Sequence, residues 1–305
     1  MTKVWISPED WHRAGEYFPY RGHRIFFRRS RATPPPAPAL LLLHGFPTSS
    51  WDWSPLWQRL ASQFHVIAPD MLGFGFSAKP IAHDYSILDQ ANLCEALLLN
   101  LGVTEYHILA HDYGDTVAQE LLARTHDGAA AALLRSVCFL NGGIFPETHR
   151  ARLVQRLLLT PFGGVVAKKM DGTRFSRNMT EVFGANTPPS QAELDAMWSM
   201  IIENDGAHVM PKLIGYMTER KQYRARWVGA LTNAGNDNIP LRLINGADDP
   251  VSGRHMAQHY ADLVPGADVM LLNGIGHYPQ IEAPQEVLRC FFGFHETRAA
   301  RRLAA

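Results

Sequence analysis

The sequence predicts an α/β protein with a mostly parallel central sheet, helices on both faces and an inserted helical segment. Strand-like and helix-like segments alternate over residues 1–140, a pattern typical of parallel sheets covered on both faces. From residue 141 to 235 the chain is rich in helix formers and lacks β-branched strand runs. Strand signals then return in residues 236–305. We therefore expect a core made of residues 1–140 and 236–305, interrupted by a helical cap at 141–235.

The elements of the first core part follow from the spacing of apolar residues. Continuous apolar runs such as ALLLL predict buried strands, and apolar residues three and four apart predict amphipathic helices. A proline-rich stretch at 34–38 predicts a surface loop. Strands are expected at 23–30, 39–45, 65–73, 107–111 and 133–143, and helices at 53–64, 86–102 and 116–124.

The remaining elements separate into cap and core by the same criteria. Helical periodicity predicts three helices in the cap, and two strand patterns followed by a helix complete the core. The cap helices are expected at 147–159, 190–204 and 208–231; the core strands at 239–251 and 267–280, with the last helix at 284–296.

Composition limits the classes of partner. The 305 residues are 46% hydrophobic and 19% charged, which is typical of a globular chain, and 29 basic residues balance 29 acidic ones. This zero net charge predicts neither a nucleic-acid nor a membrane partner, and the longest apolar run, about ten residues, is too short to span a bilayer. Three widely spaced cysteines (Cys94, Cys138 and Cys290) predict buried thiols in a reducing compartment. With no signal-like N-terminus, we expect a cytoplasmic protein, and the oligomeric state stays open.

A sharp strand-to-helix turn carries the main chemical signal. Residues 107–124, HILAHDYGDTVAQELLAR, have the pattern of a nucleophile elbow, in which a serine usually occupies the tip of G-x-S-x-G. Here the tip is Asp112, within AHDYG. Asp249 and His277 each follow a later predicted strand, so nucleophile, acid and histidine occur in the chain order of the α/β-hydrolases.

A fourth element, His44-Gly45-Phe46-Pro47, follows the first buried strand. The backbone amides of Phe46 and Tyr113 are therefore placed to form an oxyanion hole. Each element alone has an ordinary structural explanation, such as an Asx turn or a helix N-cap. All four in the correct order, each at a strand end, predict an active site.

Several segments resemble one branch of the α/β-hydrolase superfamily. HGFPTSSWDW, PDMLGFGFSAKP, HDYGDTVAQELL, NGGIFPETHR, RWVGAL and GHYPQIEAP are similar to epoxide hydrolases and haloalkane dehalogenases and, within that branch, to the mesoderm-specific transcript protein-like hydrolases. The resemblance spans about residues 8–295 and implies the α/β-hydrolase fold with a cap. It also implies a triad of Asp112, His277 and Asp249. The neighbour Asp248 is the less favoured acid by spacing, and no acid follows the strand that ends at Asn141.

An aspartate at the elbow implies covalent catalysis by a carboxylate. A carboxylate is ionised at neutral pH and can displace a leaving group from a saturated carbon, which forms an alkyl ester with the enzyme. His277 would then activate a water molecule that hydrolyses this ester, and Asp249 would orient His277. The amides of Phe46 and Tyr113 would hold the oxyanion.

The resemblance favours an epoxide over a haloalkane as the electrophile. Haloalkane dehalogenases typically carry Trp after the nucleophile and Asn or another donor after the HG pair, whereas this chain has Tyr113 and Phe46. An aromatic residue at x of H-G-x-P is common in epoxide hydrolases. Of the two cap tyrosines, Tyr216 and Tyr223, the first precedes an E-R pair and matches the ring-opening position. The second tyrosine usual in these enzymes has no equivalent early in the cap.

We therefore predict an epoxide hydrolase-like enzyme for a small or medium apolar substrate, with Tyr216 as a candidate proton donor. Three alternatives stay open: a haloalkane dehalogenase, another α/β-hydrolase activity, and a non-catalytic binding relative. The sequence contains no metal cluster, phosphate-binding loop or cofactor motif, so no cofactor is expected.

Overall fold

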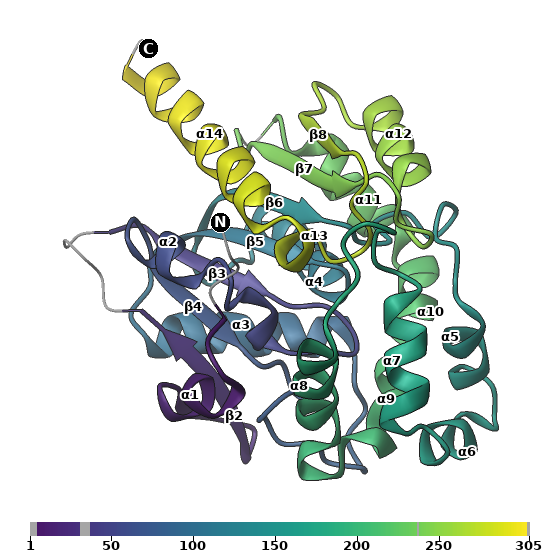
Figure 1. Cartoon of the computed structure of the whole chain (residues 1–305). Helices are drawn as coiled ribbons and strands as arrows, with labels where there is room; N and C mark the ends of the chain where they lie inside the picture. The colour runs from purple at the N-terminus through teal and green to yellow at the C-terminus, as the bar shows by residue number, and fades with distance from the viewer. Residues whose placement is uncertain (1–4, 31–36, 237, 304–305) are drawn as a thin grey trace.

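The chain forms an eight-stranded sheet with helices packed on both faces (Figure 1). The computed structural model describes residues 5–30, 37–236 and 238–303, with side chains to residue 297. Most of the proline-rich loop expected at 34–38 thus lies outside the described residues. The strands are β1 (Glu16–Tyr20), β2 (His23–Arg29), β3 (Ala39–Leu43), β4 (His65–Pro69), β5 (Glu105–His111), β6 (Leu133–Leu140), β7 (Leu241–Gly246) and β8 (Val269–Leu272).

The strands lie in the order β1-β2-β4-β3-β5-β6-β7-β8. The β1–β2 and β2–β4 pairs are antiparallel and all the others are parallel. Every residue of β3 is buried, as expected for an apolar run covered on both faces. The prediction of a mostly parallel α/β sheet is confirmed.

The register of the parallel strands brings their carboxyl ends to one edge. Leu43 at the end of β3 pairs with Ala110 of β5, and His111 pairs with Leu140 at the end of β6. Leu140 pairs in turn with Ile244 of β7. The residues that follow these strands therefore gather at the edge where ligands bind in such sheets.

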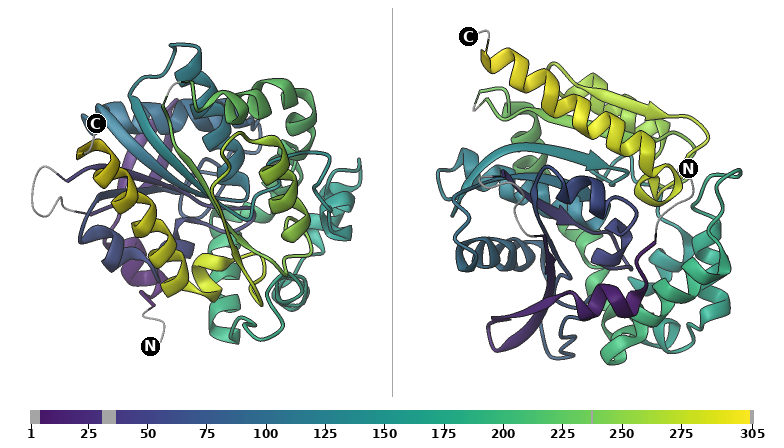
Figure 2. Two further views of the ribbon diagram at one scale, coloured as in Figure 1. Left: turned by 90° about the horizontal axis from the view of Figure 1, so that it is seen from above. Right: turned by 60° about the vertical axis from the view of Figure 1, so that its left-hand side comes forward.

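Helices cover the two faces of the sheet and this edge (Figure 2). On one face, α3, α4 and α11 pack side by side, and α14 crosses the opposite face. The core helices are α1 (Pro8–Arg13), α2 (Trp57–Ala61), α3 (Ile87–Asn100), α4 (Tyr113–His126), α12 (Arg254–Leu263), α13 (Pro279–Glu282) and α14 (Pro284–Leu303), with the 3₁₀ helix η1 (Ser50–Trp53).

The segment between β6 and β7 is helical throughout its regular parts. It contains α5 (Leu153–Leu158), α6 (Gly163–Lys168), α7 (Gly172–Thr180), α8 (Gln191–Ile202), η2 (Glu203–Val209), α9 (Met210–Leu213), α10 (Tyr216–Gln222) and α11 (Arg224–Asn233). The last of these returns to the core, where the Trp227 indole donates a 2.8 Å hydrogen bond to Glu120 of α4.

Two expectations about elements are wrong in detail, and one strand was not expected. Residues 208–231 form three helices instead of one, because the backbone around Gly215 forms hydrogen bonds to the third preceding residue and Tyr223 adopts φ −99° and ψ 15°. The helix expected at 147–159 is confined to Leu153–Leu158, since Arg152 adopts an extended N-cap conformation. The first strand, β1, pairs with β2 in a hairpin that the sequence pattern did not indicate.

Two buried charged residues fasten the inserted helices to the core. The Nζ atom of Lys79 donates to the backbone oxygens of Gly75, Met200 and Glu203, at 2.6, 3.1 and 2.5 Å. Glu282 of α13 accepts hydrogen bonds from the segment 184–187 and from the loop around residue 277.

The three cysteines are buried free thiols, as predicted. In the described chain, no helix has both the length and the apolar character needed to cross a membrane.

Candidate active site

Asp112 lies at a strained turn between β5 and α4. Its backbone has φ 47° and ψ −102°, a conformation that costs free energy for a residue other than glycine. The turn also requires Gly114, because a Cβ atom there would lie 2.3 Å from the backbone oxygen of Leu43. The side chain of Asp112 is buried within the edge formed by the strand ends. This is the geometry that the AHDYG pattern predicts.

The two carboxylate oxygens of Asp112 have different partners. The backbone N–H of Phe46 donates to Oδ2 at 3.1 Å, and the hydroxyl of Tyr216 donates to Oδ1 at 3.3 Å. Tyr113 is the first residue of α4, so its amide belongs to the helical turn whose N–H groups have no intrahelical acceptor. Oδ2 thus contacts one backbone amide, and Oδ1 contacts a phenol from the inserted helices.

His277 and Asp249 form a buried pair at the neighbouring strand ends. The Nδ1 atom of His277 lies 2.7 Å from Oδ2 of Asp249. The same oxygen accepts from Ser252 Oγ at 2.7 Å and from Asn141 Nδ2 at 3.0 Å, while Oδ1 accepts from the Val251 amide at 2.7 Å. Four donors therefore hold the carboxylate in one orientation, and Asp249 rather than Asp248 contacts the histidine.

The charges in this pair shift both pKa values. Burial alone would lower the pKa of His277, but the charge and hydrogen bond of Asp249, together with the charge of Asp112, raise it to about 9. Burial would raise the pKa of Asp249, but His277 and the surrounding donors lower it to about 2. The pair is therefore ionic while Asp112 carries its negative charge.

The backbone of His277 is fixed by neighbours that the sequence did not single out. The carboxylate of Glu282 accepts from the amides of Gly276 and Tyr278, at 2.8 and 2.9 Å, on either side of the histidine. Nε2 of His111 lies 2.7 Å from the backbone oxygen of His277. Burial lowers the pKa of His111 to about 3, so it is a neutral donor in this contact.

A buried arginine lies beside Asp112 and Tyr216. Nε of Arg220 donates to Thr116 Oγ1 at 2.9 Å, and Nη1 donates to Nδ1 of His149 at 3.3 Å. The guanidinium carbon lies 4.4 Å from the centre of the Tyr216 ring. Burial, and then the charge of Arg220, lower the pKa of His149 to about 3, which keeps that ring a neutral acceptor.

The loop after β3 is supported by His44. Its Nε2 atom accepts from the Met71 amide at 3.1 Å, and Nδ1 lies 2.9 Å from the backbone oxygen of Gly45. Because the amide can only donate, Nδ1 carries the proton and donates to Gly45. His44 therefore orients the turn that presents the amide of Phe46.

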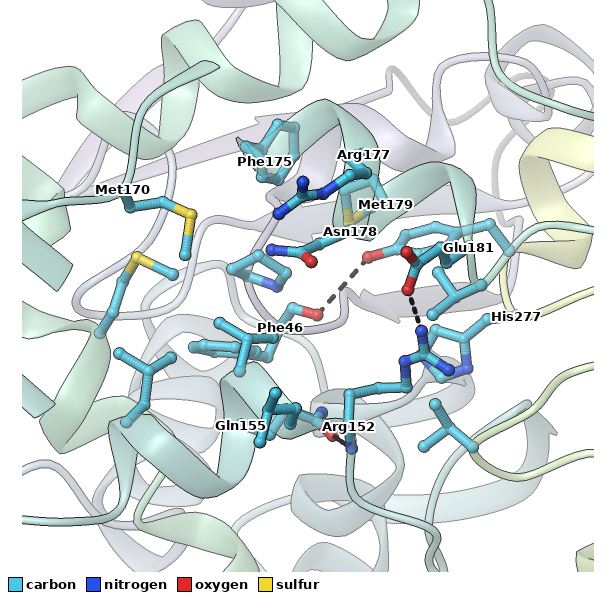
Figure 3. Close-up of a pocket in the computed structure, with 18 residues that line it drawn as sticks. Phe46, Arg152, Gln155, Met170, Phe175, Arg177, Asn178, Met179, Glu181 and His277 are labelled. Carbon is cyan, nitrogen blue, oxygen red and sulfur yellow. Dashed lines mark hydrogen bonds and ion pairs between the residues drawn. The ribbon is translucent and has the colours of Figure 1, made fainter. Parts of the chain in front are cut away.

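A cavity of about 430 Å³ extends from this site between core and inserted helices (Figure 3). Phe46 and His277 line it from the core, and its other walls are mainly apolar side chains. An ion pair between Arg152 and Glu181 lies on one side. The apolar lining includes Val154, Leu158, Met170, Phe175, Met179 and Met210. Within the described residues, no three His, Cys, Asp or Glu side chains are placed to hold a metal ion.

Comparison with known families agrees with this architecture. A family model of the alpha/beta hydrolase fold matches residues 38–284. The chain belongs to the alpha/beta hydrolase family. The hydrolase is also 46% identical over 301 residues to the human (Homo sapiens) mesoderm-specific transcript homolog protein, which covers 95% of this chain and 88% of the relative. The family prediction is thus confirmed.

Further relatives and structures extend this comparison. The hydrolase is 37% identical over 279 residues to the putative hydrolase LipZ of Mycobacterium tuberculosis (strain ATCC 25618 / H37Rv), covering 92% of this chain and 94% of that one. The structure of the haloalkane dehalogenase DbeA-M1 loop variant from Bradyrhizobium elkanii superposes with a TM-score of 0.77 and 24% identity, covering 94% and 99% of the two chains. At that identity the likeness shows the fold alone.

The structure brings all the predicted site residues to one edge of the sheet, and it adds others. Asp112, Phe46 and Tyr216 are in direct contact, and His277 contacts Asp249. Arg220, Glu282 and Asn141 were missed, although each lies inside or beside a quoted motif. A buried charge is recognisable only when the fold shows which side of its helix faces the core.

Proposed function

We propose that this hydrolase cleaves a small or medium apolar epoxide by way of a covalent ester on Asp112. The observation that carries the proposal is the pair of contacts at Asp112, with a backbone amide on Oδ2 and the Tyr216 hydroxyl on Oδ1. The first contact is what an oxyanion hole requires, and the second supplies a proton donor beside the attacking oxygen.

In the first step, Oδ1 of Asp112 would attack one epoxide carbon. A carbon–oxygen bond to the enzyme forms, the ring carbon–oxygen bond breaks, and the alkoxide takes the proton of Tyr216. Burial and the negative charge of Asp112 raise the pKa of Tyr216, so the phenol is protonated before the reaction. Arg220, whose charge acts in the opposite direction, would stabilise the phenolate that forms.

In the second step, His277 would act as the general base. Ester formation removes the charge of Asp112, which is one of the charges that raise the pKa of His277. The pKa of His277 therefore falls at the ester stage, when the histidine must accept a proton from water. Water loses a proton to Nε2 and attacks the ester carbonyl, and the amides of Phe46 and Tyr113 stabilise the oxyanion. When this intermediate collapses, the leaving alkoxide takes the proton from His277 and departs as the diol. The proton left on the Asp112 carboxyl returns to the Tyr216 phenolate, which restores both groups.

A haloalkane dehalogenase is the second candidate, because the carboxylate of Asp112 could equally displace a halide from a saturated carbon. A departing halide needs N–H donors, whereas Phe46 and Tyr113 have no side-chain N–H. The phenol of Tyr216 fits a leaving group that needs a proton, so we prefer the epoxide.

We also propose that residues 141–235 act as the cap over the site, and that the enzyme is cytoplasmic.

The test is to trap the covalent intermediate. His277→Gln should form the ester but hydrolyse it slowly, so intact mass spectrometry after incubation with epoxides and haloalkanes should reveal an adduct. Added mass equal to the whole epoxide, on the peptide that contains Asp112, would support ring opening. Added mass of an alkyl group alone would favour dehalogenation.

The control is the double variant Asp112→Asn/His277→Gln, which should form no adduct. If it is labelled as strongly as His277→Gln, Asp112 is not the nucleophile. If no substrate of the panel labels His277→Gln and the unaltered protein turns none over, the proposal of covalent epoxide hydrolysis is wrong for these substrates, and a binding role gains weight.

A further inference from the structure

The outermost inserted helices expose a concentration of apolar side chains. We call α5 and α6 with the turn between them, residues 153–168, the α5–α6 hairpin. Of the eleven large apolar side chains that are exposed in the described part of the chain, five lie on this hairpin: Leu153, Leu157, Leu159, Phe162 and Val165. Phe162 is 72% exposed and Leu153 is 64% exposed. Concentration on one element, rather than scatter, is the mark of an interaction surface.

The charge of the same segment is one-sided. Between His149 and Met170 the sequence contains five basic residues and no Asp or Glu, in a chain of zero net charge. Four of the five are exposed, and within the described residues none of these four forms an ion pair with a carboxylate. The fifth, Arg152, pairs with Glu181. The exposed four are Arg150, Arg156, Lys168 and Lys169.

The hairpin also forms part of the cavity wall. Leu153 and Leu158 of α5 line the cavity that reaches His277. The hairpin is therefore exposed to solvent and also contributes to the cavity wall. Figure 1 shows α5 and α6 at the periphery of the inserted helices, away from the sheet. An apolar molecule that reaches this surface is therefore already beside a wall of the cavity.

We propose that the α5–α6 hairpin docks on an anionic lipid surface. Exposed apolar side chains flanked by Lys and Arg are the composition that inserts into the interface of a bilayer and attracts its anionic head groups. A second copy of this chain fits the surface less well, because a two-fold contact would place the same unpaired cations against each other. We expected no membrane partner because the net charge of the whole chain is zero. That sum does not reveal the local excess of basic residues between His149 and Met170.

Vesicle sedimentation tests the proposal without any need for catalysis, so it is independent of the proposed function. The protein should sediment with vesicles of phosphatidylcholine and phosphatidylglycerol, and much less with phosphatidylcholine alone. The double variant Leu153→Ser/Phe162→Ser should lose about tenfold or more in binding, since two exposed apolar anchors are removed. Lys168→Gln/Lys169→Gln should weaken binding and reduce its dependence on salt.

The matched control is Leu99→Ser/Leu133→Ser, which alters two exposed leucines on α3 and β6 and should bind as the unaltered protein does. Circular dichroism and thermal unfolding would verify that all variants are folded. Failure to bind anionic vesicles at low salt overturns the proposal. Equal binding by Leu153→Ser/Phe162→Ser and Leu99→Ser/Leu133→Ser overturns it as well. Sedimentation equilibrium that finds a dimer lost in Leu153→Ser/Phe162→Ser, without vesicle binding, would assign the surface to self-association instead.

Discussion

The Nη2 atom of Arg220 lies 3.7 Å from the Oδ1 atom of Asp112, and both side chains are buried. Nη2 has no hydrogen-bond partner, and within the described residues Asp112 is the carboxylate that lies within ion-pair distance of this guanidinium. A buried charge is costly unless it is paired. The arginine from α10 and the aspartate at the end of β5 therefore depend on each other for stability.

This dependence predicts a strong coupling between the two residues. Arg220→Met should lower the free energy of unfolding by about 3–5 kcal/mol, because it leaves the Asp112 carboxylate buried without its cation. Adding Asp112→Asn should recover part of that loss, which chemical denaturation of the two single variants and the double variant would measure. Arg226→Met, at a partly exposed arginine that pairs with Glu120, is the control. Strictly additive losses would mean that Arg220 and Asp112 are not coupled.

The proposed ring opening predicts a selective role for the Tyr216 hydroxyl. In the His277→Gln background, Tyr216→Phe should slow adduct formation with an epoxide by about 10²–10⁴-fold, the usual contribution of a proton donor. Adduct formation with a haloalkane, which needs no proton, should change little. Tyr223→Phe is the matched control, since Tyr223 packs against Trp227. Equal rates for Tyr216→Phe and Tyr223→Phe would remove Tyr216 from the reaction.

The pair of His277 and Asp249 predicts a stability that falls at alkaline pH. The pKa of His277 is raised from 6.5 to about 9, so its contribution is complete below about pH 6.5 and is lost as the pH rises through 9. The pKa of Asp249 is lowered from 3.8 to about 2, so its contribution is lost only as the pH falls through 2. Urea unfolding should show the difference between the unaltered protein and His277→Gln shrinking between about pH 6.5 and 9. A constant difference would contradict the raised pKa.

Glu282 predicts a link between the inserted segment and the histidine loop. Its carboxylate accepts from the amides of Gly184, Gly276 and Tyr278 and from the hydroxyl of Thr187. Glu282→Ala leaves these donors without their acceptor and should cost about 2–4 kcal/mol of unfolding free energy. Glu286→Ala, at an exposed glutamate that pairs with Arg289, should cost less than about 1 kcal/mol. Thermal unfolding would compare the two, and similar losses would argue against the link.

The sequence predicted the core and the strand-end residues because both depend on local patterns. An apolar run such as 39–43 indicates a buried strand by itself, and parallel strands bring their carboxyl ends together whatever the loops between them do. Asp112, Asp249 and His277 therefore converge once the strands are recognised. The exact first and last residue of each helix or strand depends only partly on these local patterns.

The contacts made by the inserted helices were not predictable in the same way. Periodicity over 208–231 predicted one helix, but the chain forms α9, α10 and α11 there, and Arg220 of α10 lies beside Asp112. A composition average likewise gave no sign that basic residues are concentrated at 150–169. The position of Arg220 depends on tertiary packing. The basic segment depends on how the charged residues are distributed along the chain.

The three carbonyl contacts of Lys79 bear on how this protein tolerates sequence change. Lys79 holds the end of α8, and Glu282 holds residues 184–187, so that the α8 segment is anchored at both ends. In the described structure no hydrogen bond joins residues 153–170 to the core. A graft from a relative should therefore be accepted more readily at 153–170 than at 184–203. New substrate preferences are then easiest to engineer along the unanchored side of the cavity.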